Sequence, residues 1–149
     1  CLTALEPFAP EAATVLDVGC GTGVLGEVAL ALGAGSLVAI DVDPASVAAT
    51  ERAVELNGLT GRAAVSATPL QQVGGRFDLV LANLLVPIVE DLGPELVARL
   101  ADRGTLVVSG LLPEQLDRAL VALAPLRVVE LRHEQGCVVA LLRRADPAG

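Results

Sequence analysis

A loop of alternating glycines is the clearest chemical signal in the sequence. The apolar stretch Thr14 to Val18 leads into this loop, and an amphipathic segment follows it. The loop combines glycines with other small residues: Gly19, Cys20, Gly21, Thr22 and Gly23. Glycines let a ligand approach the backbone closely, and free N–H groups at the start of a helix favour an anionic group. The loop therefore predicts a binding site for a ligand that carries a carboxylate or a phosphate.

Two glycine spacings compete for this loop. Counted from Gly21, the residues match the G-x-G-x-x-G spacing of dinucleotide sites, which is a weak motif on its own. Counted from Asp17, they match D-x-G-x-G-x-G, with an acid near the end of the preceding strand. The first glycine after the strand is Gly19, and Val24 occupies the third glycine position counted from it. The second spacing is therefore favoured, and a nicotinamide-dependent oxidoreductase stays as an alternative.

A pair of acids ends the next apolar run, Ser36 to Ile40. Ligands of open parallel sheets bind outside the carboxyl ends of the strands, where Asp41 is placed to accept both hydroxyls of a ribose. Asp43 stands directly before Pro44, and a proline suits the first turn of a helix. We therefore expect Asp43 to cap that helix and Asp41 to bind the ribose of a ligand.

These two segments together resemble the class I S-adenosylmethionine-dependent methyltransferases. The resemblance rests on Val-Leu-Asp-Val-Gly-Cys-Gly-Thr-Gly at 15–23 and on Val-Ala-Ile-Asp-Val-Asp-Pro at 38–44. It implies S-adenosylmethionine as the cofactor and S-adenosylhomocysteine as the product. By the same resemblance, Asp41 holds the ribose, and the methionine portion of the cofactor is held by Asp17, Gly19, Gly21 and Gly23. Cys20, Thr22 and Val42 of the same segments are also expected to bind the cofactor.

Asn83 is a single polar residue at the end of the apolar run Phe77 to Ala82. Methyl transfer is an in-line displacement, in which the enzyme mainly positions the nucleophile and excludes water. A side-chain carbonyl can accept a hydrogen bond from an attacking amine and aim its lone pair. We therefore expect Asn83 to position the methyl acceptor and to lie against the cofactor. The alternative, which does not exclude this role, is that Asn83 caps a helix beginning at Leu84.

The surroundings of Asn83 narrow the resemblance. Glutamine and adenine N-methyltransferases carry Asn-Pro-Pro-aromatic here, whereas this chain has Asn-Leu-Leu-Val. Ala-Asn-Leu-Leu at 82–85, Gly-Thr-Leu-Val-Val-Ser-Gly-Leu-Leu at 104–112 and Glu114-Gln115 resemble the family that methylates amino groups on the stalk-base protein of the large ribosomal subunit. The resemblance implies N-methylation of amino groups on a ribosomal or other basic protein.

That family also carries an N-terminal substrate-recruiting domain and a Gly-Thr-Gly-Thr-His-like loop, neither of which stands in this sequence. The first residue is Cys1 rather than Met, so a preceding part of a longer product is one interpretation and removal of the initiator methionine is another. A catalytically inactive S-adenosylmethionine-binding module, or the partner of another subunit, is therefore a second functional alternative.

Apolar periodicity predicts the elements that hold these residues. Strands are expected over 14–18, 36–40, 63–66, 77–82 and 104–109, and helices over 24–32, 44–57, 84–100 with a break at Gly93-Pro94, and 113–123. The runs 127–132 and 137–143, joined by residues 133–136, predict an antiparallel hairpin at the sheet edge. The expected fold is α/β, a Rossmann-like seven-stranded, mostly parallel sheet with helices on both faces and a C-terminal antiparallel hairpin. One methyltransferase domain is expected over residues 1–144, with a disordered tail over 145–149.

Composition limits the partners. The net charge is −8 and aromatic residues make up 1%, which disfavours direct binding of nucleic acid and suits a basic protein partner. All ten cationic residues are Arg, so lysine-based covalent chemistry is excluded. Three cysteines without paired ligand spacing indicate a reducing cytoplasm and no metal site. The apolar runs are too short to span a membrane. The sequence does not indicate an oligomeric state.

Overall fold

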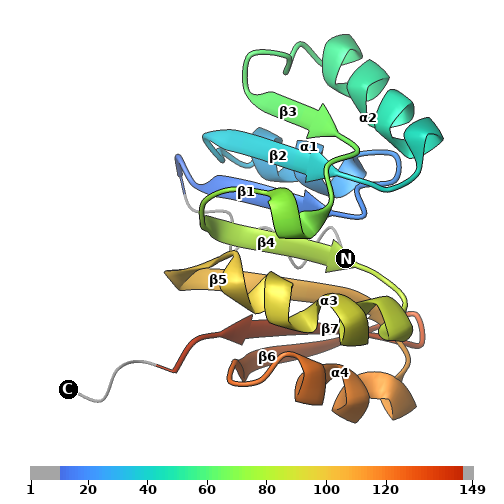
Figure 1. The fold of residues 1–149 in the computed structure, drawn as a ribbon, viewed down its shortest axis with the longest axis vertical. Helices are drawn as coiled ribbons and strands as arrows, with labels where there is room; N and C mark the ends of the chain where they lie inside the picture. Colours follow the sequence, from blue (N-terminus) through green and yellow to red (C-terminus); the bar gives the residue numbers. More distant parts are fainter. Residues whose placement is uncertain (1–10, 146–149) are drawn as a thin grey trace.

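The computed structural model describes residues 11–145, in which seven strands form one sheet in the order β3-β2-β1-β4-β5-β7-β6 (Figure 1). The strands are β1 (Thr14–Val18), β2 (Ser36–Ile40), β3 (Ala63–Ser66), β4 (Phe77–Asn83), β5 (Leu100–Leu111), β6 (Arg127–Glu134) and β7 (Cys137–Arg143). The helices are α1 (Val24–Ala31), α2 (Pro44–Leu56), α3 (Val86–Ala98) and α4 (Leu116–Ala122), with short 3₁₀ helices η2 (Leu70–Gln72) and η3 (Pro113–Gln115). The predicted α/β class and sheet are confirmed.

Strands β1 to β5 are parallel to one another, and crossovers through α1, α2 and α3 join β1 to β2, β2 to β3 and β4 to β5. The central strands β1 and β4 are buried on both faces, which explains their almost unbroken apolar sequences. Because all five strands run the same way, their carboxyl ends meet at one edge of the sheet. The polar residues that follow these strands are therefore brought together there.

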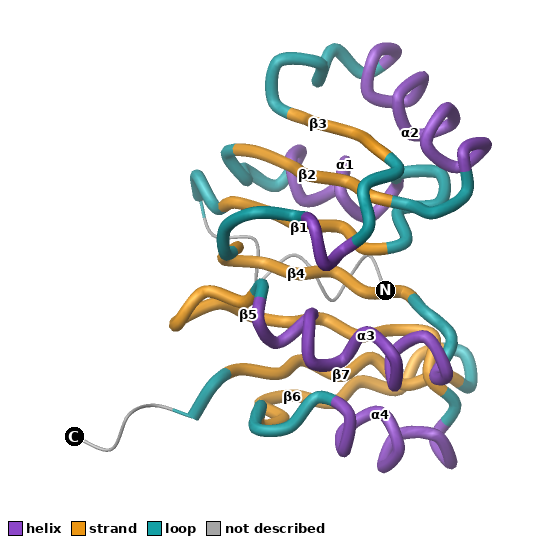
Figure 2. Tube along the Cα trace, in the orientation of Figure 1, coloured by secondary structure: helices purple, strands orange, loops and turns teal. Residues whose placement is uncertain are grey.

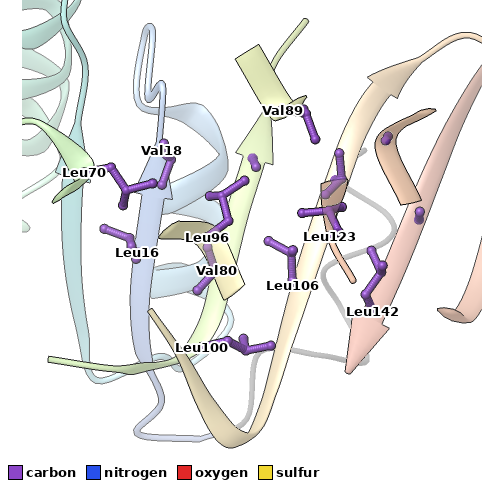
Figure 3. Packing of buried hydrophobic residues seen from close by; sticks show 14 of the residues in the cluster. Leu16, Val18, Leu70, Val80, Val89, Leu96, Leu100, Leu106, Leu123 and Leu142 are labelled. Carbon is purple, nitrogen blue, oxygen red and sulfur yellow. The ribbon is translucent and has the colours of Figure 1, made fainter. Parts of the chain in front are cut away.

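Helices cover both faces of the sheet, as the crossovers require (Figure 2). Helices α3 and α4 and the short η2 lie over one face, where they enclose the larger cluster of buried side chains (Figure 3). Figure 3 shows side chains of β1, β4, β5 and β7 gathered with those of α3 in this layer, among them Leu16, Val80, Leu106 and Leu96. Helix α1 packs on the opposite face with Ala29 and Leu30.

The predicted C-terminal antiparallel hairpin forms at the edge of the sheet, with its second strand on the inside. Strand β7 lies between β5 and β6 and is antiparallel to both, so β6 is the edge strand. Residues Val138 to Leu142 are all buried, whereas β6 is largely exposed, and this difference places β7 inside. The turn is two residues long, Gln135 and Gly136, both with positive φ, so His133 belongs to β6 rather than to the turn.

Helix α3 differs from its prediction at both its start and its middle. It begins at Val86 and continues without a break through Pro94. Buried residues on both sides of the proline, Val89 and Leu96, pack on the sheet and stabilise a single helix in spite of the lost hydrogen bond. Gly93 is needed for a different reason, because a Cβ at this position would overlap the carbonyl of Ala122 in α4.

Residues 1–10 and 146–149 lie outside the described part, and with them Cys1 and nearly all of the tail expected over 145–149. None of the helices between residues 11 and 145 is long and apolar enough to cross a membrane.

Candidate functional site

A cleft of about 360 Å³ opens at the carboxyl ends of β1, β2 and β4. Its floor is formed by residues of these strand ends, Val18, Gly19, Ile40, Asp41, Val42 and Asn83. Its walls come from the segment around η2 and the start of α3, namely Thr68, Pro69, Leu70, Gln71, Leu84, Leu85, Ile88 and Leu92. This is the edge at which open parallel sheets bind ligands.

The glycine loop takes a shape that only glycine adopts readily. Gly19, Gly21 and Gly23 all have positive φ, at 72°, 57° and 85°. Three of the loop N–H groups donate to backbone carbonyls within the chain. Those of Gly19 and Cys20 donate to the carbonyl of Ile40, at 2.8 and 3.0 Å, and that of Gly23 donates to Cys20. The loop offers a ligand open space at Gly21, where no heavy atom lies within 4 Å of the Cβ position.

Asp41 joins the two predicted ligand segments. Its Oδ2 accepts the N–H of Gly21 at 3.0 Å, and its Oδ1 accepts the N–H of Asp43 at 2.9 Å. Asp43 in turn caps α2 by accepting the N–H of Ala45 at 3.0 Å, as predicted. The half-buried Asp41 carboxylate thus holds the glycine loop against the end of β2 and also lines the cleft.

Thr50 of α2 fixes the loop from behind and was not singled out by its sequence context. Its side chain is fully buried, and its hydroxyl donates to the carbonyl of Gly21 at 3.0 Å and contacts the Cys20 sulfur at 3.3 Å. Burial raises the pKa of the Cys20 thiol, so this cysteine packs as a neutral group. The sequence of α2 mixes polar and apolar residues, so Thr50 stands out only once the structure shows that it is buried.

Asp17 lies behind the loop rather than on the wall of the cleft. Its side chain is 1% exposed, and burial raises its pKa from 3.8 to about 7, with a hydrogen bond from the Gly26 backbone opposing the shift and the charge of Asp41 adding to it. The Oδ2 atom of Asp17 finds no hydrogen-bond partner among the described residues. A buried acceptor without a donor indicates a position that a ligand or a proton completes.

Asn83 is the last residue of β4 and is exposed within the cleft. The suggestion that it caps the following helix is wrong, because Leu85 occupies the N-cap position of α3. Asn83 pairs with Ser109 across β4 and β5, so the strand ladder positions it. Its amide is therefore available to a bound molecule.

The cleft brings together four of the predicted site residues, Gly19, Asp41, Val42 and Asn83. The other five, Asp17, Cys20, Gly21, Thr22 and Gly23, do not line it. The Val42 side chain is 86% exposed at the rim. The walls formed by the η2 segment and the start of α3 were missed, because apolar residues of a wall look the same in sequence as those of a core. Among residues 11–145, no three His, Cys, Asp or Glu side chains gather as metal ligands would.

Comparison with known proteins fits this arrangement. A family model described as ribosomal protein L11 methyltransferase (PrmA) matches residues 1–142. The chain belongs to the ribosomal protein L11 methyltransferase family. The family predicted from the glycine loop and the Asn83 segment is thereby confirmed, and the match favours methyl transfer over the nicotinamide alternative.

The curated relatives are longer than this chain. The ribosomal protein L11 methyltransferase of Dechloromonas aromatica is 40% identical over 144 residues, which cover 95% of this chain and 48% of the relative. That of Pelobacter propionicus is 42% identical over 136 residues, covering 90% of this chain and 44% of the relative. The chain spans about half the length of the curated relatives that it matches.

Solved structures agree with the fold. The ribosomal protein L11 methylase from Lactobacillus delbrueckii subsp. bulgaricus superposes with a TM-score of 0.86 at 32% identity, over 96% of this chain and 78% of that one. An RNA methyltransferase from Salinibacter ruber, solved in complex with S-adenosylhomocysteine, shares the fold with a TM-score of 0.78 at 16% identity, over 98% of this chain and 91% of that one.

Proposed function

We propose that the chain transfers a methyl group from S-adenosylmethionine to an amino group of a ribosomal or other basic protein. The observation that carries the proposal is the exposed Asn83 amide in the same cleft as Asp41. A group-transfer site needs an acceptor-positioning group beside the group that binds the donor. Relatives named as ribosomal protein L11 methyltransferases support a ribosomal protein as the substrate.

The residues around the cleft suit S-adenosylmethionine. No heavy atom lies within 4 Å of the point where a Cβ of Gly21 would stand, so a ligand has room against its backbone. The unpartnered oxygen of Asp17 is a buried acceptor that suits the amino group of the cofactor. Asp41 retains lone pairs on both carboxylate oxygens for the ribose hydroxyls. When bound, this cofactor supplies an electrophilic methyl group on a positively charged sulfur.

The remaining polar groups act on the acceptor. In the proposed reaction, the carbonyl oxygen of Asn83 accepts an N–H of a neutral amine and fixes the direction of its lone pair. The apolar side chains at the cleft mouth, Leu85 and Ile88, are 71% and 41% exposed and are placed to exclude water once a substrate covers them. Asn83 is therefore the proposed catalytic residue.

The charge of the chain supports a basic protein as the partner. A net charge of −8 attracts a basic protein and repels a nucleic acid backbone, so direct nucleic-acid binding is not part of the proposal. A ribosomal substrate agrees with the cytoplasmic location that the cysteines predict. This location stays a prediction.

Calorimetric titration of the 149-residue chain with S-adenosylmethionine, S-adenosylhomocysteine and NADH tests the first half of the proposal. The two sulfur compounds are expected to bind and NADH is not. Binding of NADH alone refutes the methyltransferase assignment.

Mass spectrometry of ribosomal protein L11 incubated with the chain and S-adenosylmethionine tests the second half. Added methyl groups are expected with the unchanged chain. Asn83→Ala is expected to add them at least about tenfold more slowly, because the hydrogen bond that orients the acceptor amine is lost. Cofactor binding without transfer to L11 or to other basic proteins contradicts the enzyme and favours a cofactor-binding module.

A further inference from the structure

Asn83, the last residue of β4, and Leu84, which follows it, occupy the space that a side chain on each of two glycines would need. A Cβ on Gly110 would stand 2.7 Å from Oδ1 of Asn83, and a Cβ on Gly19 would stand 2.5 Å from Cδ2 of Leu84. Both glycines have positive φ, at 80° and 72°. Asn83 and Leu84 therefore lie between β5 on one side and the glycine loop on the other, each in direct contact with a glycine.

The geometry of Gly110 comes from an irregularity in β5. The pairing of β5 with β7 shifts register between Val108 and Leu111, whereas the pairing of β4 with β5 continues to Asn83 and Ser109. The irregularity therefore lies directly beyond the residue that pairs with Asn83. Bulges of this kind redirect side chains next to functional sites. Here the bare backbone of Gly110 faces the amide oxygen of Asn83.

Leu84 provides the second contact. Its side chain lines the cleft, packs against the larger core cluster and fills the space beside Gly19. Gly19 is the first residue of the loop that Asp41 and Thr50 hold in place. The peptide that carries the Asn83 amide is thus packed against the cofactor loop through its neighbour.

We propose that Gly110 and Leu84 are positioning residues: Gly110 sets the direction of the Asn83 amide, and Leu84 keeps that amide in register with the glycine loop. The inference rests on the proposed function, in which Asn83 orients the acceptor amine. Any side chain at position 110 would push the amide oxygen away from its observed place. Accurate placement of a reacting amine governs the rate of transfer more than it governs cofactor affinity.

The chain offers a matched control for this test. Gly136, in the hairpin turn, has φ 82°, nearly the same as Gly110, but no heavy atom lies within 4 Å of its Cβ position. Gly110→Ala and Gly136→Ala therefore place an alanine at nearly the same positive φ, and only the first introduces a contact with Asn83. Both variants are expected to lower the Tm by roughly 2–4 °C, the shift that a small loss of stability causes in a domain of this size.

The first readout does not depend on activity. The side-chain NH₂ signals of Asn83, assigned by their loss in Asn83→Ala, are recorded in ¹⁵N correlation spectra. Gly110→Ala is expected to shift these signals, and Gly136→Ala to leave them in place. Leu84→Ala, which carries no backbone strain, is expected to shift both these signals and the backbone signal of Gly19. Unmoved Asn83 signals in both Gly110→Ala and Leu84→Ala overturn the proposal.

Kinetics supply the second readout. Gly110→Ala is expected to lower kcat at least about tenfold while the Kd for S-adenosylhomocysteine changes less than about twofold, because the interaction is made with the acceptor. Gly136→Ala is expected to retain kcat. An equal fall in kcat for both variants assigns the effect to backbone strain and overturns the proposal. If the unchanged chain neither binds the cofactor nor transfers methyl groups, the proposed function fails, while the Asn83 signals still decide the positioning role.

Discussion

The buried carboxyl group of Asp17 is expected to make folding stability fall as pH rises. The pKa is raised from 3.8 to about 7 in the folded chain, mainly by burial. Below pH 3.8 both the folded and the unfolded chain hold the proton. Between the two values the unfolded chain has lost it and the folded chain keeps it, so each further rise in pH favours unfolding. Above about pH 7 the cost is constant, at roughly 4 kcal/mol for a shift of this size.

The change that lies within a convenient range is smaller than this total. From about pH 5.5 to about pH 8, the contribution of Asp17 to the free energy of unfolding is expected to fall by about 2 kcal/mol. Urea unfolding measured across this range reports it as a midpoint that falls by roughly 1 M. In Asp17→Asn, which keeps the shape and removes the ionisation, this component of the pH dependence is expected to disappear.

The difference between the two chains isolates the group, because other carboxylates contribute equally to both. Asp102→Asn is a control, since the Asp102 side chain is 85% exposed and pairs only at the surface with Arg76. If Asp17→Asn and the unchanged chain differ in unfolding free energy by the same amount at every pH, the carboxyl group does not titrate in the folded chain as burial requires, and the reasoning is refuted.

Three further substitutions test other contacts. Asp41→Ala is expected to weaken binding of S-adenosylhomocysteine by at least about 1.5 kcal/mol in calorimetry, because the ribose and the loop lose a charged acceptor. The control Asp102→Ala is expected to leave this affinity unchanged, and equal affinities of the two variants argue against the ribose role of Asp41. Thr50→Val is expected to destabilise the chain by about 1 kcal/mol in urea unfolding and to weaken S-adenosylhomocysteine binding, since the hydrogen bond that holds the loop is lost. Thr50→Ser is expected to retain binding, and retained affinity in Thr50→Val contradicts the role of this hydrogen bond. Gly93→Ala is expected to lower the free energy of unfolding by about 1–3 kcal/mol, because its methyl group meets the carbonyl of Ala122. Alanine favours helices more than glycine does, so a gain in Tm would show that this contact does not limit the packing.

The parts of the fold that depend on local sequence were predictable. The cap at Asp43 and the turn from β1 into the glycine loop follow from residues that are adjacent in the chain. The position of β7 between β5 and β6 was not predicted, because it is set by packing against β5: the apolar β7 is buried there, and β6, which carries Arg127, Glu130 and Arg132, lies at the exposed edge. The same limit applies to Pro94, where packing on both sides outweighs a local helix breaker.

The candidate site divides in the same manner. Asp41 and Asn83 are single polar residues at strand ends, so their position could be inferred from the sequence and is found in the cleft. The burial of Asp17 and the contact of Thr50 with the loop depend on how α1 and α2 pack, which no spacing in the sequence encodes. The hydrogen bonds that hold the loop could not be inferred either, since they depend on the end of β2, which provides acceptors for the N–H groups of Gly19, Cys20 and Gly21.

The insertion of β7 between β5 and β6 has a consequence for synthesis and assembly. A ribosome makes β6 before β7, yet β6 has no place in the sheet until β7 has paired with β5. During translation, therefore, neither the edge of β5 nor Arg127–Glu134 can form its pairing with β7 until Cys137–Arg143 has left the exit tunnel. Among the described strands, β7 is synthesised last. A nascent chain stalled before residue 137 therefore exposes the unpaired edge of β5, and an edge of this kind recruits chaperones or pairs with another chain.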